Sequence, residues 1–464
     1  MFNYKSYTYT NLIFFCVLFL IFPQVVHALD DTRDNQDAPN IRVSLGLDLK
    51  EAEIAFSAGG RIVDSTKDKQ IVSSEKTHSY KLTTDGSKIK IKDIDGSFTS
   101  LQFLPSSGSL LAYKGKKYRG TFRVISKKTG LQIINNVGIE EYLYGVVSFE
   151  VPMSWNIEAI TAQAVAARTY AVRCLNQYPD FEFDVYDSVK DQVYGGVDGE
   201  KPNSIASVDT SRGIILSYQG WPIKAYYCAD AGGQTEQSKY VFTNDLPYLQ
   251  SVQSMDNLEK HRWNFIITRP QLTELFKSCT YKLGEIQDLV ITSVSPTGRP
   301  GTIKVTGSKA SHEFSSNDFR KIIGAGKVRS TLFTIVSKNG KSPDVGSAIN
   351  IRSVSIKKPE SKLKCVSSSG LKEIQNPKVS ILGNGLSVDT DLIGKTAITA
   401  QLGNIYLPVE KITPKEGEFL FVGSGFGHGV GMSQWGAKAY ADSGWDYKQI
   451  LLHYYRGAEL TVWY

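Results

Sequence analysis

The chain has 464 residues, of which 41% are hydrophobic and 21% are charged, so it can fold into one or more packed cores. The 53 Lys and Arg residues exceed the 46 Asp and Glu residues by 7, and no block of five or more like charges occurs. Because this excess of positive charge is distributed along the chain, it argues against nucleic-acid binding and favours a mild attraction to acidic polymers or surfaces.

The first 28 residues have the pattern of a secretory signal peptide. Lys5 precedes the apolar run Leu12–Phe22, and small residues precede an expected cleavage site after Ala28. The run is shorter than the roughly 20 residues of a membrane-spanning helix. We therefore expect the protein to work outside the cytoplasm, secreted or associated with the cell envelope, with this segment removed or retained as an anchor. Residues 29–40 are polar, and we expect a disordered linker there.

A β-rich N-terminal region is predicted over residues 41–137. The alternating runs include Ile41–Leu45, Lys88–Ile91 and Thr121–Ile125, and the turn sequences between runs are Asp85-Gly86, Asp95-Gly96 and Lys128-Thr129-Gly130. Alternation with period two, bounded by such turns, is typical of antiparallel strands and hairpins.

An alanine-rich helix is predicted to begin near Asn156, because small and apolar residues recur there with helical spacing. The apolar run before it, which ends at Glu150, is interpreted as a strand. Further along the chain we expect the following elements: strands at 214–216 and 223–227, a hairpin over 289–306, a helix from Ser315 to Ile323, an inserted β-rich module over 337–415, and helices around Ala437 and over 447–455.

Glu150 is the first candidate for chemistry. The apolar neighbours Val146, Val147, Phe149 and Val151 should disfavour its charged form and raise its pKa toward that of a general acid. The alternative is an exposed acid near a helix N-terminus, where a negative charge is mildly stabilising.

A glycine-rich string over residues 426–437 is the second candidate. Glycines on both sides of His428 allow tight turns and a close backbone approach to a ligand. Ser433, Gln434 and Trp435 add neutral hydrogen-bonding groups and an aromatic face, which suit a sugar better than a phosphate. No lysine stands where a phosphate-binding loop requires one. The alternative is a structural loop with a satisfied histidine.

The cysteines give little evidence of a metal site. Cys174, Cys228, Cys279 and Cys365 lie far apart, so at most one disulfide or a set of free thiols is expected. A structural zinc site needs clustered Cys and His ligands, which are absent. We predict no cofactor.

These segments, in order, resemble the stage II sporulation protein D family, which includes the LytB-type amidase enhancers. The resemblance rests on Tyr142–Pro152, Ala162–Ala171, Asp191–Tyr194, the Gly232-Gly233 turn and Gly427–Ala437. It covers residues 41–336 and 416–464 as two parts of one domain, with 337–415 as an insertion. Some relatives are thought to hold zinc with Cys and His around the turn Cys228–Ala231, but this chain has only Cys228 there, which argues against a metal.

The resemblance implies a strand-rich α+β fold in which the alanine-rich helix follows the strand that carries the catalytic acid. It implies a lytic transglycosylase that cleaves peptidoglycan glycan strands free of stem peptides, with Glu150 as the catalytic residue, in cell-wall remodelling or sporulation. The alternative is a non-catalytic wall-binding enhancer of a cell-wall amidase. The candidate substrate-binding residues are Gln163, Arg168, Tyr194, Gly232, Gly233, Thr235, Glu236, His428, Gly429, Gly431, Ser433 and Gln434.

Overall fold

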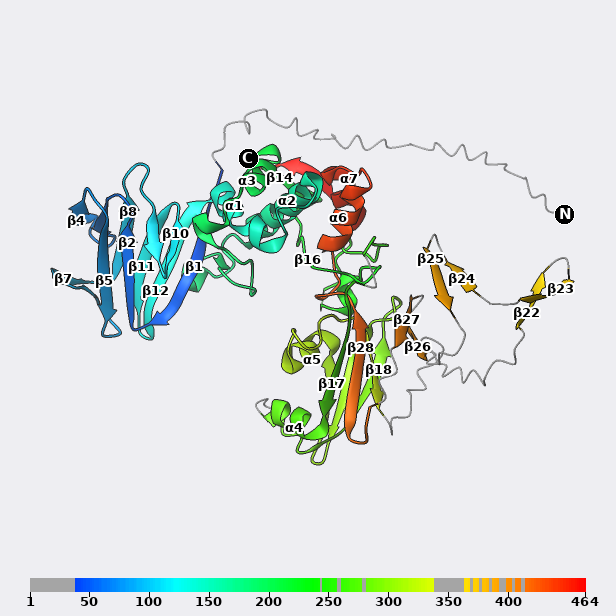
Figure 1. Ribbon diagram of the computed structural model, residues 1–464. Helices are drawn as coiled ribbons and strands as arrows, with labels where there is room; N and C mark the ends of the chain where they lie inside the picture. Colours follow the sequence, from blue (N-terminus) through cyan, green and yellow to red (C-terminus); the bar gives the residue numbers. More distant parts are fainter. Residues whose placement is uncertain are drawn as a thin grey trace, which may run out of the picture. The chain divides into compact units, whose positions relative to one another are not determined.

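The computed structural model describes residues 38–242, 244–256, 260–277, 281–337 and 414–464, and the backbone of six short strands between residues 363 and 409. The described chain is strand-rich with several separate helices, which confirms the expected α+β class (Figure 1). Within these residues, no helix is long and apolar enough to cross a bilayer. The predicted signal peptide and most of the predicted linker lie outside the described residues.

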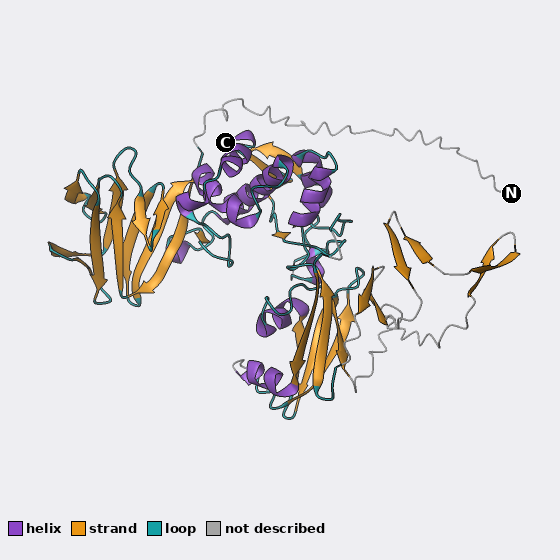
Figure 2. Cartoon of the chain, in the orientation of Figure 1, coloured by secondary structure: helices purple, strands orange, loops and turns teal. Residues whose placement is uncertain are grey.

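The N-terminal region consists of two antiparallel sheets without intervening α-helices (Figure 2). The first sheet also takes in the short strand β13, which pairs with β1 in parallel. Its order is β13 (Val185–Tyr186), β1 (Asn40–Leu49), β12 (Gly130–Gly138), β11 (Thr121–Lys127), β8 (Ser100–Pro105), β3 (Gly60–Asp64) and β4 (Lys69–Ser74). The second is β10 (Lys116–Tyr118), β9 (Leu111–Tyr113), β2 (Glu51–Phe56), β5 (His78–Thr84), β6 (Ile89–Ile91) and β7 (Ile94–Phe98).

The two sheets pack through aromatic side chains. The ring of Phe56 on β2 lies 5.9 Å from that of Phe103 on β8, and both side chains are fully buried. The expected β-rich region is therefore present. Two details differ: Asp95-Gly96 lies inside β7 rather than in a turn, and Asn40 already belongs to β1 rather than to a linker.

A helical layer built around α2 follows this region. The helix is buried on nearly every side, because its many alanines allow neighbouring segments to approach closely. It contacts α1, α3, α6 and α7 (Figure 1). The layer comprises α1 (Ile139–Glu150), α2 (Ile157–Cys174), α3 (Pro202–Thr210), α6 (Gln434–Asp442), α7 (Tyr447–Tyr454) and the sheet β15 (Trp221–Pro222), β14 (Ile214–Tyr218) and β30 (Glu459–Val462). The described residues also form the short 3-10 turns η2 (Pro179–Phe181), η3 (Gly196–Gly199) and η4 (Ser238–Tyr240).

The segment before Glu150 is a helix, so its interpretation as a strand was wrong. In α1, the buried apolar side chains are Ile139, Tyr142, Leu143, Val146 and Val147. This spacing of three and four residues is helical. The helical period could not be recognised in the short apolar run from 142 to 151, because a continuous apolar stretch fits a buried strand equally well.

A third group of elements has its own core, in which Phe319 and Phe421 stack. One sheet is β17 (Arg262–Thr268), β28 (Glu418–Ser424) and β21 (Phe333–Ser337), so strands far apart in sequence are neighbours (Figure 1). The other is β18 (Ile286–Val294), β19 (Pro300–Gly307) and β20 (Ser311–Ser315), with α4 (Arg269–Lys277) and α5 (Ser316–Ile323). The expected 289–306 hairpin and the helix capped by Ser315 are confirmed.

The remaining elements are short. The expected strand at 223–227 is mostly irregular, and only β16 (Tyr227–Cys228) pairs, in parallel, with β29 (Met432–Ser433). Most of the predicted insertion lies outside the described residues. Its described backbone forms three hairpins: β22 (Leu363–Ser367) with β23 (Gly370–Ile374), β24 (Lys378–Gly383) with β25 (Leu386–Asp391), and β26 (Ile398–Leu402) with β27 (Ile405–Val409).

Candidate active site

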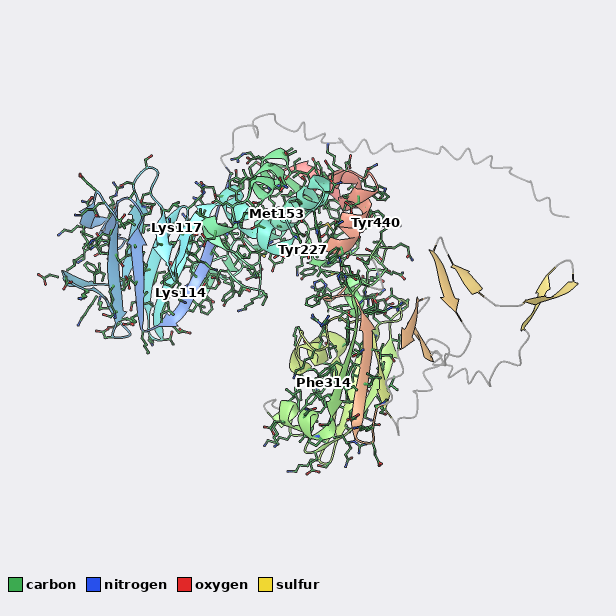
Figure 3. The ribbon with its side chains drawn as sticks, viewed as in Figure 1. Lys114, Lys117, Met153, Tyr227, Phe314 and Tyr440 are labelled. Carbon is green, nitrogen blue, oxygen red and sulfur yellow. The ribbon has the colours of Figure 1, made fainter. Side chains whose placement is uncertain are left out.

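Three of the motif segments meet where β16 pairs with β29. Tyr227 lies opposite Met432, and Cys228 lies opposite Ser433. The chain then enters α6 at Gln434, whose N-cap is Ser433. Tyr227 packs against the core formed by α2, α6 and α7 (Figure 3). This arrangement places the segment from Tyr227 to the Gly232-Gly233 turn together with the glycine string, beside the C-terminal end of α1.

Glu150, the last residue of α1, is the acid at this meeting point. The Nε2 of Gln434 donates a hydrogen bond of 3.3 Å to its Oε2. The Tyr227 hydroxyl and the Val193 backbone N–H also bond its carboxylate. Burial raises the pKa of Glu150, and the three donors oppose that rise. The direction expected from the sequence is therefore confirmed.

The apolar enclosure expected for Glu150 is only partly present. Val146, Val147 and Val151 are buried, but Phe149 is 49% exposed and lies on the outer side of the helix. The groups that bond the carboxylate are polar. Glu150 is therefore held by hydrogen bonds and is partly buried by the surrounding fold.

Gln434 connects Glu150 to the middle of α2. Its Nε2 also donates to Oε1 of Gln163 at 3.3 Å. Gln163 is fully buried, and its own Nε2 has no hydrogen-bond partner within the part of the chain that the structure describes. The two predicted glutamines therefore lie with Glu150 as expected, and one amide there still has unused donor capacity.

Tyr227 is oriented by a chain of buried groups behind it. The hydroxyl of Tyr142 donates to Oε1 of Gln192 at 3.2 Å, and Nε2 of Gln192 donates to the hydroxyl oxygen of Tyr227 at 3.1 Å. Because Tyr227 accepts from Gln192, its own proton is directed to Glu150. Burial raises the pKa of Tyr227 well above its ordinary value, so the phenol stays protonated.

Ser433 belongs to a second polar group next to the first. Its hydroxyl donates to Oδ1 of Asp256 at 2.5 Å and accepts from the N–H of Ala231. Burial and the charge of Asp230 raise the pKa of Asp256 to about 6. Asp230, in turn, bonds the Nδ1 of His261 at 2.5 Å. Ser433 thus fixes the entry into α6.

The glycine string approaches the protein's own chain closely. A Cβ at Gly431 would lie 1.9 Å from the carbonyl oxygen of Tyr226, and one at Gly429 would lie 2.6 Å from Cζ of Arg299. His428 accepts a hydrogen bond from the Val430 N–H, and burial lowers its pKa to about 4. The imidazole is therefore neutral at neutral pH, and these residues serve the local packing.

Four predicted binding residues are buried and bonded to protein groups. Arg168 forms an ion pair with Glu140, and Tyr194 packs on Tyr142. The Thr235 hydroxyl accepts from the Val252 N–H, and Glu236 accepts from the hydroxyls of Ser295 and Thr297. Within the part of the chain that the structure describes, none of these bonds joins these four side chains to Glu150, so they lie apart from the proposed acid.

The glycine pair turns the chain after β16. Gly232 and Gly233 have φ values of 67° and 89°, and their N–H groups donate to Asp230 and Asp256. Cys228 and Cys174 are buried free thiols. Within the described residues, no three His, Cys, Asp or Glu side chains are placed to hold a metal ion.

Sequence reasoning missed several groups at the site. Gln192 lies in the motif Asp191–Tyr194, and Tyr227 lies in the strand expected at 223–227. Nothing in the spacing of these residues indicates that they contact Glu150. Asp256 and His261 lie in a stretch without any recognised motif. The β-bridge between Gln234 and Gln253 places the segment that carries Asp256 near the site. The pairing of β17 with β28 does the same for His261, which directly precedes β17.

Comparisons with known proteins agree with the motifs. Residues 127–218 match the family model described as stage II sporulation protein. The chain is 29% identical to an amidase enhancer of Bacillus subtilis over 82% of this chain and 50% of that protein, so it spans half the length of that relative. It is 24% identical to stage II sporulation protein D of the same organism, over 72% of this chain and 77% of that protein. An uncharacterized protein of Brachyspira hyodysenteriae is 27% identical over 75% of this chain and 73% of its own length. These matches support the resemblance of the chain to the family of stage II sporulation protein D and the amidase enhancers.

Proposed function

We propose that this protein acts on peptidoglycan in the cell envelope as a lytic transglycosylase that cleaves glycan strands. The observation that carries the proposal is the Glu150 carboxyl, whose pKa is raised by burial and which three donors hold in one orientation. A general acid needs a pKa near the working pH and a fixed position. The names of the relatives support a role at the cell wall.

A single carboxyl suits transglycosylation better than hydrolysis. Hydrolytic glycosidases use two carboxylates, about 5–9.5 Å apart. Among the described residues, no second carboxylate contributes to the pKa shift of Glu150, and its bonded partners are Tyr227, Gln434 and the Val193 amide. The chemistry proposed here therefore uses one residue first as an acid and then as a base.

The reaction begins with proton transfer from Glu150 to the oxygen that leaves C1 of a muramic acid residue. The C1–O bond breaks, and the sugar's own C6 hydroxyl oxygen attacks C1. Glu150, now a carboxylate, accepts the proton of that hydroxyl. A 1,6-anhydro sugar forms and no water is consumed. The donors around Glu150 hold its carboxyl in place for both steps.

The second candidate is a non-catalytic protein that binds wall glycan and enhances an amidase. The observation that favours it is the similarity to an amidase enhancer over 82% of this chain. In that case the partners would be glycan strands and an amidase, and Glu150 would contribute only to binding. Both candidates require the protein to reach the wall, so we propose a location outside the cytoplasm, secreted or attached to the envelope.

The experiment is incubation of purified protein with peptide-free glycan strands, followed by mass spectrometry of the products. Anhydro-muramic ends are expected. Reducing ends would indicate a hydrolase, and unchanged glycan that sediments with the protein would indicate the enhancer.

Replacing Glu150 tests the assignment of the acid. Glu150→Gln keeps the size of the side chain but removes the transferable proton, so cleavage should fall by about 10²–10⁴-fold while glycan binding remains. Glu141→Gln, in the first turn of the same helix, is the matched control and should keep its activity. Thermal unfolding checks that both variants are folded. Product formation by Glu150→Gln within a few-fold of the wild type would remove Glu150 as the acid.

A further inference from the structure

Two of the three groups that bond the Glu150 carboxyl can only donate. They are Nε2 of Gln434, at 3.3 Å from Oε2, and the Val193 backbone N–H. The third group is the Tyr227 hydroxyl, which can donate or accept. If this hydroxyl accepted from Glu150, the acid would share its proton with Tyr227 instead of a substrate. The direction of the Tyr227 hydroxyl therefore decides where the proton of Glu150 can go.

Gln192 sets this direction from behind the tyrosine. Its side chain is 1% exposed, and its Nε2 lies 3.1 Å from the Tyr227 hydroxyl oxygen. Because an amide nitrogen can only donate, Tyr227 must accept from it. The hydroxyl proton of Tyr227 is then left for Glu150.

Two contacts fix the orientation of the Gln192 amide. Its Nε2 also lies 3.4 Å from the carbonyl oxygen of Ala167 in α2, and that oxygen can only accept. Its Oε1 accepts from the Tyr142 hydroxyl at 3.2 Å. Turning the amide over would bring two oxygens together at Ala167 and would leave the buried Tyr142 hydroxyl facing a donor. The amide nitrogen is therefore held toward Tyr227.

The backbone around Gln192 is held as well. The carboxylate of the preceding residue, Asp191, accepts from the Tyr170 hydroxyl at 2.8 Å. The following residue, Val193, supplies its N–H to Glu150. One short segment thus reaches the proposed acid directly, through a backbone amide, and indirectly, through the Gln192 side chain.

We propose that Gln192 is a positioning residue of the candidate active site: by donating to Tyr227, it directs the Tyr227 proton to Glu150 and leaves the proton of the acid for the substrate. This inference rests on the proposed function. With Tyr227 held as a donor, Glu150 has no acceptor among its three bonded partners. The donation from Gln192 also strengthens the bond that Tyr227 gives, because linked hydrogen bonds polarise one another.

The test measures the protonation of Glu150 in the full chain without substrate. Infrared spectra are recorded across pH, and subtraction of the spectrum of the same protein with Glu150→Gln isolates the carboxyl band of Glu150. Gln192→Met removes the donating amide at nearly constant size, and Tyr227→Phe removes the hydroxyl that it orients. Gln132→Met is the matched control, because Gln132 is also a buried glutamine and its amide donates elsewhere, to the Phe181 carbonyl.

Without the Gln192 donor, the bond from Tyr227 stabilises the carboxylate less. At fixed pH, the ratio of protonated to ionised Glu150 should therefore rise about two- to tenfold, as expected when one hydrogen bond weakens. Tyr227→Phe should change the ratio in the same direction, and the double variant should go no further than Tyr227→Phe alone, because Gln192 acts through that hydroxyl. Gln132→Met should leave the ratio unchanged.

A residue that only supports packing would give no change, or a change that adds to that of Tyr227→Phe, and either result would overturn the role of Gln192. Thermal unfolding checks that the variants are folded, and Gln192→Leu, which also lacks polar groups, serves as a second variant. The anhydro-product assay separates this inference from the proposed function. If the ratio changes as expected but the wild type releases no anhydro product, Gln192 still orients the acid and the lytic reaction is wrong. If product forms while the ratio is unaffected, the reaction stands and the role of Gln192 is wrong.

Discussion

The pKa of Glu150 is set by two opposing influences of its surroundings. Burial disfavours the carboxylate, whereas the bonds from Tyr227, Gln434 and the Val193 amide favour it. Burial dominates, so Glu150 retains its proton to a higher pH than an exposed glutamate does. Activity that depends on this proton should fall as pH rises through the raised pKa.

Tyr227→Phe tests this balance. Removing the hydroxyl removes one bond to the carboxylate, so the pKa of Glu150 should rise further. The alkaline limb of the pH profile of kcat/KM should therefore move to higher pH, because the acid stays protonated longer. The measurement is the rate of anhydro-product formation across pH.

Tyr226→Phe is the matched control for this profile. Tyr226 is the preceding residue, and its ring faces Phe242 and His428 instead of Glu150. Its profile should superimpose on that of the wild type. An alkaline limb that stays in place, or moves to lower pH, in Tyr227→Phe would contradict the role given to this hydroxyl.

The glycine string provides a second prediction for single residues. Gly431 and Gly108 both have φ 74°, but a Cβ would lie 1.9 Å from the Tyr226 carbonyl at the first and would meet nothing within 4 Å at the second. At either site, an alanine with positive φ should lower the free energy of unfolding by about 1–2 kcal/mol. Gly431→Ala should lower it by about 1–3 kcal/mol more, because the backbone must also shift to make room for the Cβ. If Gly431→Ala and Gly108→Ala lose the same free energy of unfolding in urea, the backbone at Gly431 can accommodate a Cβ without shifting.

At the scale of elements, periodicity in the sequence predicted α2, α5, α6, α7 and the hairpins, because each has a clear repeat or a capping residue. It failed for α1, where apolar residues on the buried face and their neighbours merge into one run. It also failed for the strand at 223–227, where only Tyr227 has strand conformation, although the Ile223 N–H still donates to the Leu216 carbonyl of β14. Contacts between distant segments decide such cases, and one sequence does not contain them.

The predicted binding role of Arg168 illustrates the same limit. Its guanidinium and the Glu140 carboxylate form two hydrogen bonds, 3.0 and 2.8 Å long, that join α2 to the first turn of α1. Both side chains are almost completely buried, at 0% and 3% exposure. Bonds from Arg168 to the Val208 and Ile214 carbonyls add α3 and β14 to this junction. Arg168 therefore holds helices in place.

Glu140→Gln should consequently reduce stability. It leaves the Arg168 charge without its partner in the interior, which costs about 3–5 kcal/mol of the free energy of unfolding. Glu51→Gln is the matched control, because Glu51 pairs with Lys81 at the surface, and its unfolding curve should stay close to that of the wild type. The readout is urea unfolding, with glycan binding measured in the absence of urea. Lost binding at unchanged stability would instead support a ligand-binding role for Arg168.

At the scale of the whole chain, the candidate site depends on segments separated by almost 300 residues. Glu150 and Gln434 are bonded directly, and Tyr227 reaches them through the pairing of β16 with β29. The motifs predicted which segments would participate. The sequence could not show that the second polar group, with Asp256 and His261, would lie next to them, because those residues follow no recognisable pattern.

The third group of elements also brings distant parts of the chain together. Ser337, at the end of β21, pairs with Phe419, near the start of β28, and the two strands are antiparallel neighbours. Residues 338–417 thus connect the adjacent ends of two paired strands, and residues 338–413 make up most of this connection. A connection at such a place can be shortened to a turn without changing the order of the strands.

Replacing residues 338–413 with a linker of a few Gly, Ser and Asn residues should leave a folded protein. All described residues of the core around Phe319 and Phe421 lie outside the deleted range, so their packing against one another should be retained. A shorter loop also has a lower entropic cost of closure, so stability should not fall for that reason. We expect one cooperative unfolding transition and glycan cleavage within a few-fold of the wild type, measured by calorimetry and by the anhydro-product assay. Loss of cooperative unfolding would instead show that residues 338–413 contribute to the main core, and intact unfolding with lost cleavage would assign them a part in the reaction.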